Sequence, residues 1–347
     1  MTLPAKRIAL NRQKPPEVQY EIKVVDVQQS DKIRSMNRPI VIFISALFFS
    51  VISARGANGA PGDLQDVLLH TIGETLHEFA AVKLKSNQLA VTMIDLRDRA
   101  HPIQASYRGD APIYPASVIK LFYLVAAHRW MEDGKLQDSA ELSRAMKDMI
   151  VDSSNDATHY VLDSLTGTTG GPELLEPEMK IWSEKRNAVN RYFAALGYSG
   201  CNMNQKPWGD GPYGRERLFV GKNYENRNAL TTDATARLLS DIVLGRAVSE
   251  ARSRQMMELL KRDPSKPPPA DTCEPDQSRD FTGVALKPGA KLWSKAGWTS
   301  TARHDAAYIE LPDGHKFILV TFTVGHGNDR NIIPAIARRI QENYRAE

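Results

Sequence analysis

Residues 114–122 read YPASVIKLF, and they decide how the rest of the chain is interpreted. Ser117 and Lys120 stand three positions apart at the start of an apolar helical run, so both lie on one face of the helix. A serine hydroxyl becomes a good nucleophile when a neighbouring base takes its proton, and a lysine with a lowered pKa can be that base. Pro115 fits the first helical turn, where backbone N–H groups favour negative charge. The stretch predicts a nucleophilic serine with a lysine partner, although taken alone a helix-start serine and a solvated lysine are the commoner explanation.

A second set of candidate groups lies between two predicted helices, in Ser153-Ser154-Asn155. The Ser153 hydroxyl can relay a proton to a leaving nitrogen, and the Asn155 amide can hold a substrate carbonyl. Serine and asparagine also favour helix N-caps, and for this stretch alone a cap is the simpler explanation.

The third set is Lys295-Ala296-Gly297-Trp298, at the end of a predicted strand. Lys295 offers positive charge to a substrate carboxylate and can lower the pKa of Lys120. Gly297 lets a ligand approach the backbone closely, and the N–H groups of Ser117 and Trp298 can form an oxyanion hole. A solvated strand lysine beside a turn glycine is the alternative.

Hydrophobic periodicity places strands at both ends of the folded part and helices between them. The predicted strands are 88–96, 103–108, 291–298, 303–311 and 316–324. The predicted helices include 63–84, 117–132, 139–151, 231–244 and 332–344. The simplest packing is an α/β (α+β) fold. It has a five-stranded, mainly antiparallel sheet built from both chain ends and flanked by helices, beside an all-helical lobe.

In this single domain, 61–347, we expect a sheet lobe of about 61–110 plus 287–347 and a helical lobe of about 111–286. Residues 204–228 are expected to form an ordered loop, because a long segment of this composition is usually functional. Residues 263–280 are expected to form a proline-rich surface insertion.

The amino-terminal segment indicates export. Residues 1–35 are polar, and residues 36–60 combine a basic flank, an apolar run at 39–54 and small residues, which is typical of a signal peptide. An uncleaved membrane anchor is the alternative, and Met36 as the true start would account for the polar leader. We therefore expect a periplasmic or extracellular protein, in which a disulfide between Cys201 and Cys273 is permitted but not established.

Charge and metal-ligand patterns narrow the function classes. The formal net charge is +4 at 347 residues, and there is no dense Lys/Arg block, so nucleic-acid binding has no support. The eight histidines and two cysteines do not cluster with metal-ligand spacing. Neither a metal nor another cofactor is expected.

Together and in this order, the three stretches resemble those of the class A β-lactamases and the wider penicillin-recognising serine hydrolases. The signature of that family is Ser-x-x-Lys, Ser-Asp-Asn and Lys-Thr-Gly. The similarity extends to residues 149–157, 230–239 and 286–289, and it covers roughly residue 64 to the C-terminus with gaps.

The resemblance implies roles for individual residues. Ser117 would be acylated, Lys120 would activate it, and Ser153 would pass a proton to the leaving nitrogen. Asn155 would bind the substrate amide. Lys295 would attract the substrate carboxylate, with Arg303 as a second cation, unless Arg303 is a plain surface arginine.

The chain departs from the family pattern at three places. Ser154 stands where the family has aspartate, and Ala296 where it has threonine. Loss of the threonine hydroxyl removes a hydrogen bond to a charged group, worth roughly 1.5–3 kcal/mol. The Glu-x-x-Leu-Asn of class A enzymes, whose glutamate activates the deacylating water, is missing, and family register points to Glu216 instead. A surface salt bridge with its flanking arginines is the alternative for Glu216.

Three functions remain open from the sequence. The leading one is an exported class A-like β-lactamase that hydrolyses a β-lactam through an acyl-enzyme. The second is a D-Ala-D-Ala peptidase, amidase or esterase acting on an acyl-D-Ala-like substrate, and the third is a non-hydrolysing penicillin-binding sensor. The resemblance also implies a monomer that contacts a membrane only through an uncleaved anchor.

Overall fold

The computed structural model describes residues 63–208, 211–265 and 275–344, so the expected leader and signal segment lie outside the described residues. Six strands form one antiparallel sheet in the order β2-β1-β6-β5-β4-β3. The strands are β1 (Leu89–Asp95), β2 (Ile103–Tyr107), β3 (Lys261–Arg262), β4 (Lys291–Trp298), β5 (Ala302–Glu310) and β6 (Lys316–Val324). The expected sheet from both chain ends is confirmed.

The sheet has six strands where we predicted five. The additional strand β3 contains two residues and pairs only with Leu292 and Trp293 of β4. Two residues are too few to show the period-two alternation from which strands are predicted. β1, by contrast, is buried along its whole length, which matches its nearly continuous apolar sequence.

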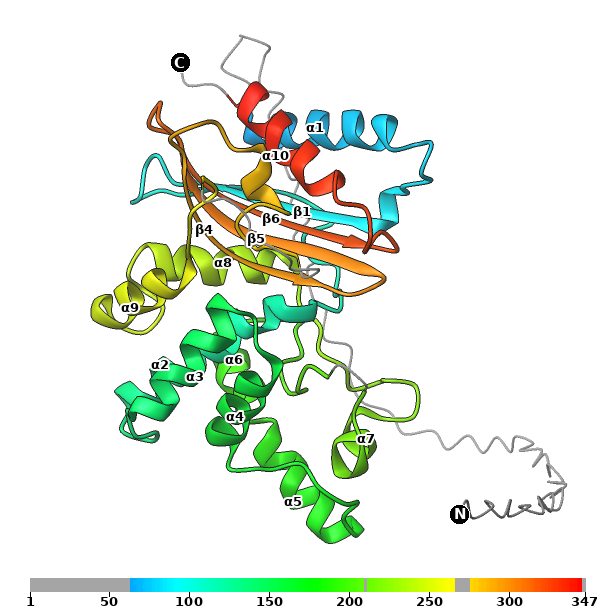
Figure 1. Ribbon diagram of the computed structural model, residues 1–347, viewed down its shortest axis with the longest axis vertical. Helices are drawn as coiled ribbons and strands as arrows, with labels where there is room; N and C mark the ends of the chain where they lie inside the picture. Colours follow the sequence, from blue (N-terminus) through cyan, green and yellow to red (C-terminus); the bar gives the residue numbers. More distant parts are fainter. Residues whose placement is uncertain (1–62, 209–210, 266–274, 345–347) are drawn as a thin grey trace, which may run out of the picture. The chain divides into compact units, whose positions relative to one another are not determined.

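Helices cover both faces of the sheet (Figure 1). On one face lie α1 (Leu64–Glu78) and α10 (Ile332–Asn343), and on the other α8 (Thr232–Val243), α9 (Glu250–Leu260) and the helical lobe. The lobe contains α2 (Lys120–Glu132), α3 (Ala140–Val151), α4 (Asn155–Thr166), α5 (Glu176–Arg186), α6 (Ala188–Ala195) and α7 (Gly214–Val220). Two apolar cores follow from this arrangement, one on each face.

Side-chain caps define several helix starts. Ser139, Ser154, Thr231 and Ser249 each accept a hydrogen bond from a backbone N–H in the first turn. Such a cap satisfies one of the N–H groups that a helix start leaves unpaired. The predicted cap at Thr231 is confirmed.

Two other expectations need correction. The predicted helix 117–132 begins instead as a 3-10 helix, η2 (Ala116–Ile119), and becomes α-helical only at Lys120. The expected loop 204–228 contains the short helix α7, which begins at Gly214 and is followed by Gly221.

Cys201 is a free, partly buried thiol, and Cys273 lies outside the described residues. No helix in the described ranges is both long and apolar enough to cross a membrane.

Candidate active site

The turn that carries Ser117 is held in an unusual conformation. Ala116, immediately before the serine, has φ +47°, a left-handed conformation that costs a non-glycine residue about 1–3 kcal/mol. A buried histidine on β5 holds this turn: His304 Nε2 lies 2.9 Å from the Tyr114 carbonyl oxygen, while its Nδ1 accepts from Thr323 N–H. Burial lowers the pKa of His304 to about 4, so it remains a neutral donor to this turn. The sequence analysis did not identify this residue.

Gly297 allows β4 to touch the same turn. A methyl group at position 297 would lie 2.7 Å from both the Pro115 carbonyl oxygen and the Ser117 nitrogen. Gly297 pairs with His304 across the sheet, so both residues face the nucleophile's turn. Because position 297 carries no side chain, the sheet can approach Ser117 this closely.

The backbone of Trp298 is oriented toward the site by strand geometry. Ala296 N–H donates to Gln277 Oε1 at 3.2 Å, which shows that it points away from β5. Residues two apart in a strand direct their N–H groups to the same side, so Trp298 N–H also leaves the sheet at this edge. Because Gly297 contacts the turn, Trp298 N–H and Ser117 N–H lie at the same junction, as an oxyanion hole requires.

Lys120 reaches across to the loop between α3 and α4. Its Nζ donates to the Ser153 carbonyl oxygen at 2.5 Å, to Ser153 Oγ at 3.3 Å and to Asn155 Oδ1 at 2.9 Å. Burial of the side chain lowers the pKa of Lys120 to about 7. An amine with this pKa is substantially neutral near pH 7 and can accept a proton.

The loop presents Ser153 because its neighbours take the structural role. Ser153 has φ +56°, and Ser154 caps α4 by accepting from Ala157 N–H at 3.1 Å. A serine can provide this cap as well as the family's aspartate can, so the departure at Ser154 leaves the loop intact. Ser154 takes the capping role that the sequence offered for this stretch, and the Ser153 side chain is left to contact the two lysines.

Ser153 Oγ lies between two lysines. Lys295 Nζ donates to it at 3.0 Å, opposite the contact from Lys120. The Lys295 side chain is fully buried, and desolvation, with the charges of Lys120 and Arg262, holds its pKa well below the usual range. Since both ammonium groups donate to Ser153 Oγ, the serine proton remains available for a third group in the cleft.

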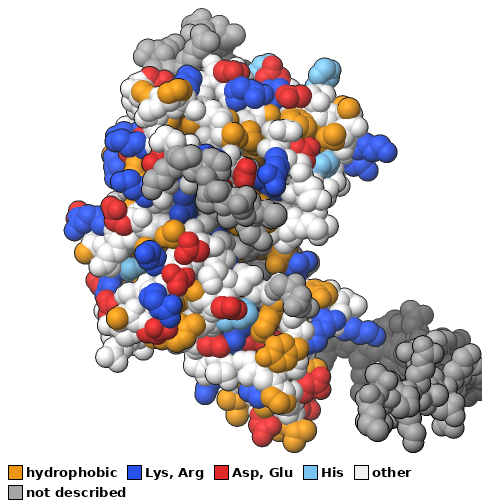
Figure 2. Space-filling model, in the orientation of Figure 1, with side chains coloured by type: hydrophobic (Ala, Val, Ile, Leu, Met, Phe, Trp, Pro, Cys, Tyr) orange, Lys and Arg blue, Asp and Glu red, His pale blue; other side chains and the backbone are white. Residues whose placement is uncertain are grey.

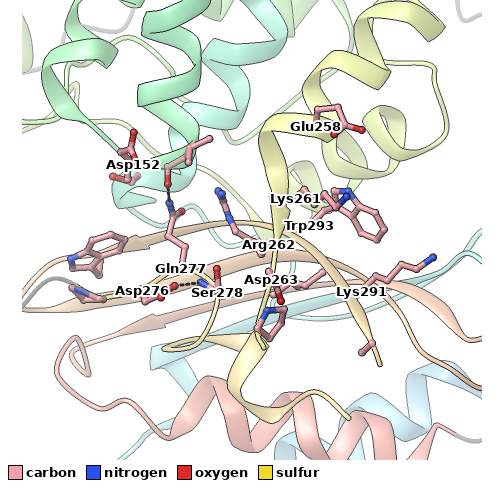
Figure 3. Close-up of a pocket in the computed structure, with 18 of the residues that line it drawn as sticks. Asp152, Glu258, Lys261, Arg262, Asp263, Asp276, Gln277, Ser278, Lys291 and Trp293 are labelled. Carbon is pink, nitrogen blue, oxygen red and sulfur yellow. Dashed lines mark hydrogen bonds between the residues drawn. The ribbon is translucent and has the colours of Figure 1, made fainter. Parts of the chain in front are cut away.

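These side chains open on one cleft of about 1430 Å³ between the helical lobe and the β3–β4 edge of the sheet. Ser117, Ser153, Asn155 and Trp298 line one part of it. Figure 3 shows the charged and polar residues of the remaining wall, among them Asp152, Gln277 and Lys291. On the face drawn in Figure 2, acidic and basic side chains are mixed, without one sign predominating.

Glu216 belongs to a buried ion-pair cluster outside this cleft. Its Oε1 lies 2.8 Å from Arg186 Nη2 and 3.4 Å from Lys206 Nζ, and Asp163 pairs with both cations at 3.0 and 2.6 Å. Glu216 is fully buried and is not among the residues that line the cleft. Glu216 thus pairs with Arg186 and Lys206, and not with the flanking arginines that we considered. Among the described contacts it has none with Ser117 or Lys120.

Arg303 is also directed away from the cleft. It lies opposite Trp298 in the sheet, is 2% exposed, and donates to the Asp280 carbonyl oxygen at 2.6 Å. Its guanidinium carbon lies 4.1 Å from the ring centroid of Phe281. It is therefore a buried residue covered by the preceding loop, and not a surface arginine.

The sequence analysis also missed Gln277. This residue comes from the stretch predicted as a surface insertion, yet it is 7% exposed and hydrogen-bonds Lys295. An isolated glutamine in a proline-rich segment has no pattern from which such a contact could be predicted.

Comparison with known proteins shows the family to which the chain belongs. A family model described as the β-lactamase enzyme family matches residues 138–344, more than half of the chain. The chain belongs to this β-lactamase family. No curated protein sequence gives a significant match.

Solved β-lactamase structures share the fold. A β-lactamase from Sphaerobacter thermophilus is 18% identical with a TM-score of 0.56, over 79% of this chain and 97% of that one. One from Xanthomonas campestris is 15% identical with a TM-score of 0.57, over 81% and 98%. A PBP-A mutant captured as an acyl-enzyme with penicillin G is 17% identical with a TM-score of 0.56, over 80% and 97%. At these identities the likeness concerns the fold.

Replacement of Gly297 by alanine tests the contact between β4 and the nucleophile's turn. The added methyl would have to displace either the turn or the strand. A shift of about 1 Å at a reacting group costs about 10²-fold, so we expect a loss of this order in the rate of Ser117 acylation. Gly73→Ala in α1 is the matched control, because no atom lies within 4 Å of the added methyl. Equal acylation rates in the two variants would contradict this role of Gly297.

Replacement of Glu216 by glutamine distinguishes a structural from a catalytic carboxylate. The change leaves two buried cations with one anion, and breaking a buried ion pair typically costs about 3–5 kcal/mol. We expect the free energy of unfolding to fall by this order while Ser117 acylation persists. The exposed Glu250→Gln, which loses only its surface pair with Arg254, serves as control and should change stability little. Unchanged stability, together with an acyl-enzyme that hydrolyses much more slowly than that of the parent protein, would instead identify Glu216 as the deacylation base.

Proposed function

We propose that this protein is a serine acyl-hydrolase of the β-lactamase type that forms an acyl-enzyme at Ser117. The observation that carries the proposal is that Lys120 and Lys295 both hydrogen-bond Ser153 Oγ, at 3.3 and 3.0 Å, with the pKa of Lys120 lowered to about 7. This arrangement offers a proton acceptor near Ser117 and a proton donor for the leaving group in one cleft.

The acylation step follows from these positions. Neutral Lys120 takes the Ser117 proton as Ser117 Oγ bonds to the substrate carbonyl carbon. The N–H groups of Ser117 and Trp298 stabilise the resulting oxyanion. When the intermediate collapses, Ser153 donates its proton to the leaving nitrogen or oxygen, and the proton on Lys120 returns to Ser153.

Release of the acyl group is where this chain departs from class A β-lactamases. In those enzymes a glutamate activates the hydrolytic water. The corresponding candidate here, Glu216, is neutralised by Arg186 and Lys206. We infer a slow deacylation, so that the acyl-enzyme accumulates. This favours the amidase, esterase or peptidase alternative over an efficient β-lactamase.

We also infer that the protein acts outside the cytoplasm, as a monomer. The support is the signal-like pattern of residues 36–60, together with the family resemblance.

The direct test follows Ser117 acylation by intact mass while product release is monitored spectroscopically. The probes are a chromogenic cephalosporin and p-nitrophenyl acetate. We expect a Ser117 adduct that forms faster than it hydrolyses, and no adduct in Ser117→Ala. Rapid turnover without accumulation would contradict slow deacylation, whereas no Ser117-dependent adduct with either probe would contradict the proposed function.

The pH dependence of acylation tests Lys120 as the base. Burial lowers the lysine pKa to about 7, so the reactive neutral amine is depleted below this pH and predominates above it. With the uncharged ester as substrate, we expect the acylation rate to rise about tenfold per pH unit below 7 and to level off above about 8. Lys120→Arg keeps the charge, but the arginine cannot lose its proton in this range, so this variant should lack the rise in acylation rate toward pH 7. A flat profile between pH 5 and 9 in the parent protein would exclude Lys120.

A further inference from the structure

The loop segment 276–281 lies against both cations that the family resemblance assigns to a substrate carboxylate. Gln277 accepts from Lys295 Nζ at 2.6 Å and from Ala296 N–H at 3.2 Å. Its amide nitrogen donates to the carbonyl oxygens of Ile150 and Val151, at 3.2 and 2.9 Å. Those carbonyls end α3 and would otherwise lack a helical partner. The Gln277 side chain is therefore fully hydrogen-bonded between the two lobes. Figure 3 shows this side chain in the wall of the cleft, with one of its hydrogen bonds as a dashed line.

Lys295 has no N–H left for a ligand. An ammonium group has three donors, and those of Lys295 are directed to Ser153 Oγ, Gln277 Oε1 and the Ala296 carbonyl oxygen, at 3.0, 2.6 and 2.7 Å. The side chain is 0% exposed. A carboxylate could bind this lysine only by displacing Gln277 or Ser153, and loss of Ser153 would disrupt the proton path.

The second cation is covered by the same segment. Arg303 donates to the Asp280 carbonyl oxygen at 2.6 Å and lies against the ring of Phe281. Phe281 also packs with Ala296 and Ile333 in a small apolar cluster. The position where the family has a threonine hydroxyl is thus filled with hydrocarbon, which binds a carboxylate poorly.

The other charged residues of the cleft do not replace the contacts that Lys295 and Arg303 would make with a substrate carboxylate. Arg262 lines the wall but donates to the Ile150 carbonyl oxygen at 2.9 Å. Asp152 and Asp276, next in sequence to Ser153 and Gln277, add negative charge to the same wall. Lys261 and Lys291 line the wall together with Glu258 and Asp263, so charges of both signs are mixed there and do not form one cationic site for a carboxylate.

We propose that Gln277 determines specificity by taking the carboxylate's place on Lys295, so that the site selects acyl substrates without a carboxylate beside the scissile bond. The substrate class is a neutral ester or amide. This inference rests on the proposed acylation of Ser117, and it reverses the role that the resemblance gave to Lys295 and Arg303.

The test compares one chemical scaffold with and without its charge. Acylation of Ser117 is measured by intact mass with a chromogenic cephalosporin and with its methyl ester, and p-nitrophenyl acetate reports the nucleophile independently. We expect the parent protein to react at least about tenfold faster with the ester than with the free acid, because the carboxylate would lose hydrogen bonds to water in the site without gaining a partner there. Preference for the free acid would overturn the proposal.

Two variants at position 277 extend the test. Gln277→Ala frees one Lys295 donor and should lower the ester-to-acid rate ratio about tenfold. Gln277→Glu keeps the size of the side chain and places a carboxylate on Lys295, so its ratio should equal or exceed that of the parent. The ratio is taken within each variant, so a general loss of stability does not affect it. Equal ratios in all three proteins would overturn the proposal, and failure of every probe to acylate Ser117 would refute the function on which it rests.

Discussion

The contact between Gly297 and the Ser117 turn is the constraint on which the site depends. The sheet and the helical lobe are built from different parts of the chain, and at this point they approach so closely that a methyl group would not fit. His304, opposite Gly297 on β5, hydrogen-bonds the same turn through the Tyr114 carbonyl. Two neighbouring strands therefore hold the left-handed Ala116, and with it the direction of the nucleophile. A strained backbone conformation of this kind persists only where several surrounding contacts hold it.

Two buried lysines are brought together by this junction, and their charges shape the chemistry. Desolvation acts on both, and the charge of Lys120 further disfavours the protonated form of Lys295. Ser153 Oγ accepts hydrogen bonds from both ammonium groups and so couples them without a carboxylate between them. Buried Asp305 on β5 opposes the lowering of the Lys295 pKa, whereas Asp163 and Glu216 pair with Lys206 and Arg186. Burial lowers the pKa of Lys120 to about 7, so this amine can be neutral near pH 7 and accept a proton.

Much of the fold could be predicted because its signals are local. Continuous or alternating apolar residues mark β1, β4, β5 and β6, and Thr231 marks the start of α8. Of the candidate site, Ser117, Lys120, Ser153, Asn155, Lys295, Gly297 and Trp298 are brought together, since their spacing relative to helix and strand ends is itself a local property. The surroundings of the Glu216 and Arg303 side chains could not be predicted in this way. Their partners, Arg186 and Phe281, are set by tertiary packing of segments that no sequence pattern pairs with one another.

The contact of Gln277 with the site could not be predicted for a similar reason. Proline-rich composition predicts neither a helix nor a strand, but it says nothing about which side chains turn inward. Gln277 turns inward because four polar groups need partners there: the Lys295 ammonium, the edge N–H of Ala296, and the last carbonyls of α3. Without Gln277, Lys295 would keep its bonds to Ser153 Oγ and the Ala296 carbonyl, and the Ile150 carbonyl would keep its bond from Arg262. The Ala296 N–H would lose its acceptor, and a buried group left without a hydrogen bond costs more than an average hydrogen bond contributes. In a relative that binds a carboxylate, the ligand can satisfy part of this demand. In this chain Gln277 satisfies it, and under the proposed selectivity for neutral substrates Ala296 can replace threonine because no ligand carboxylate has to be held there.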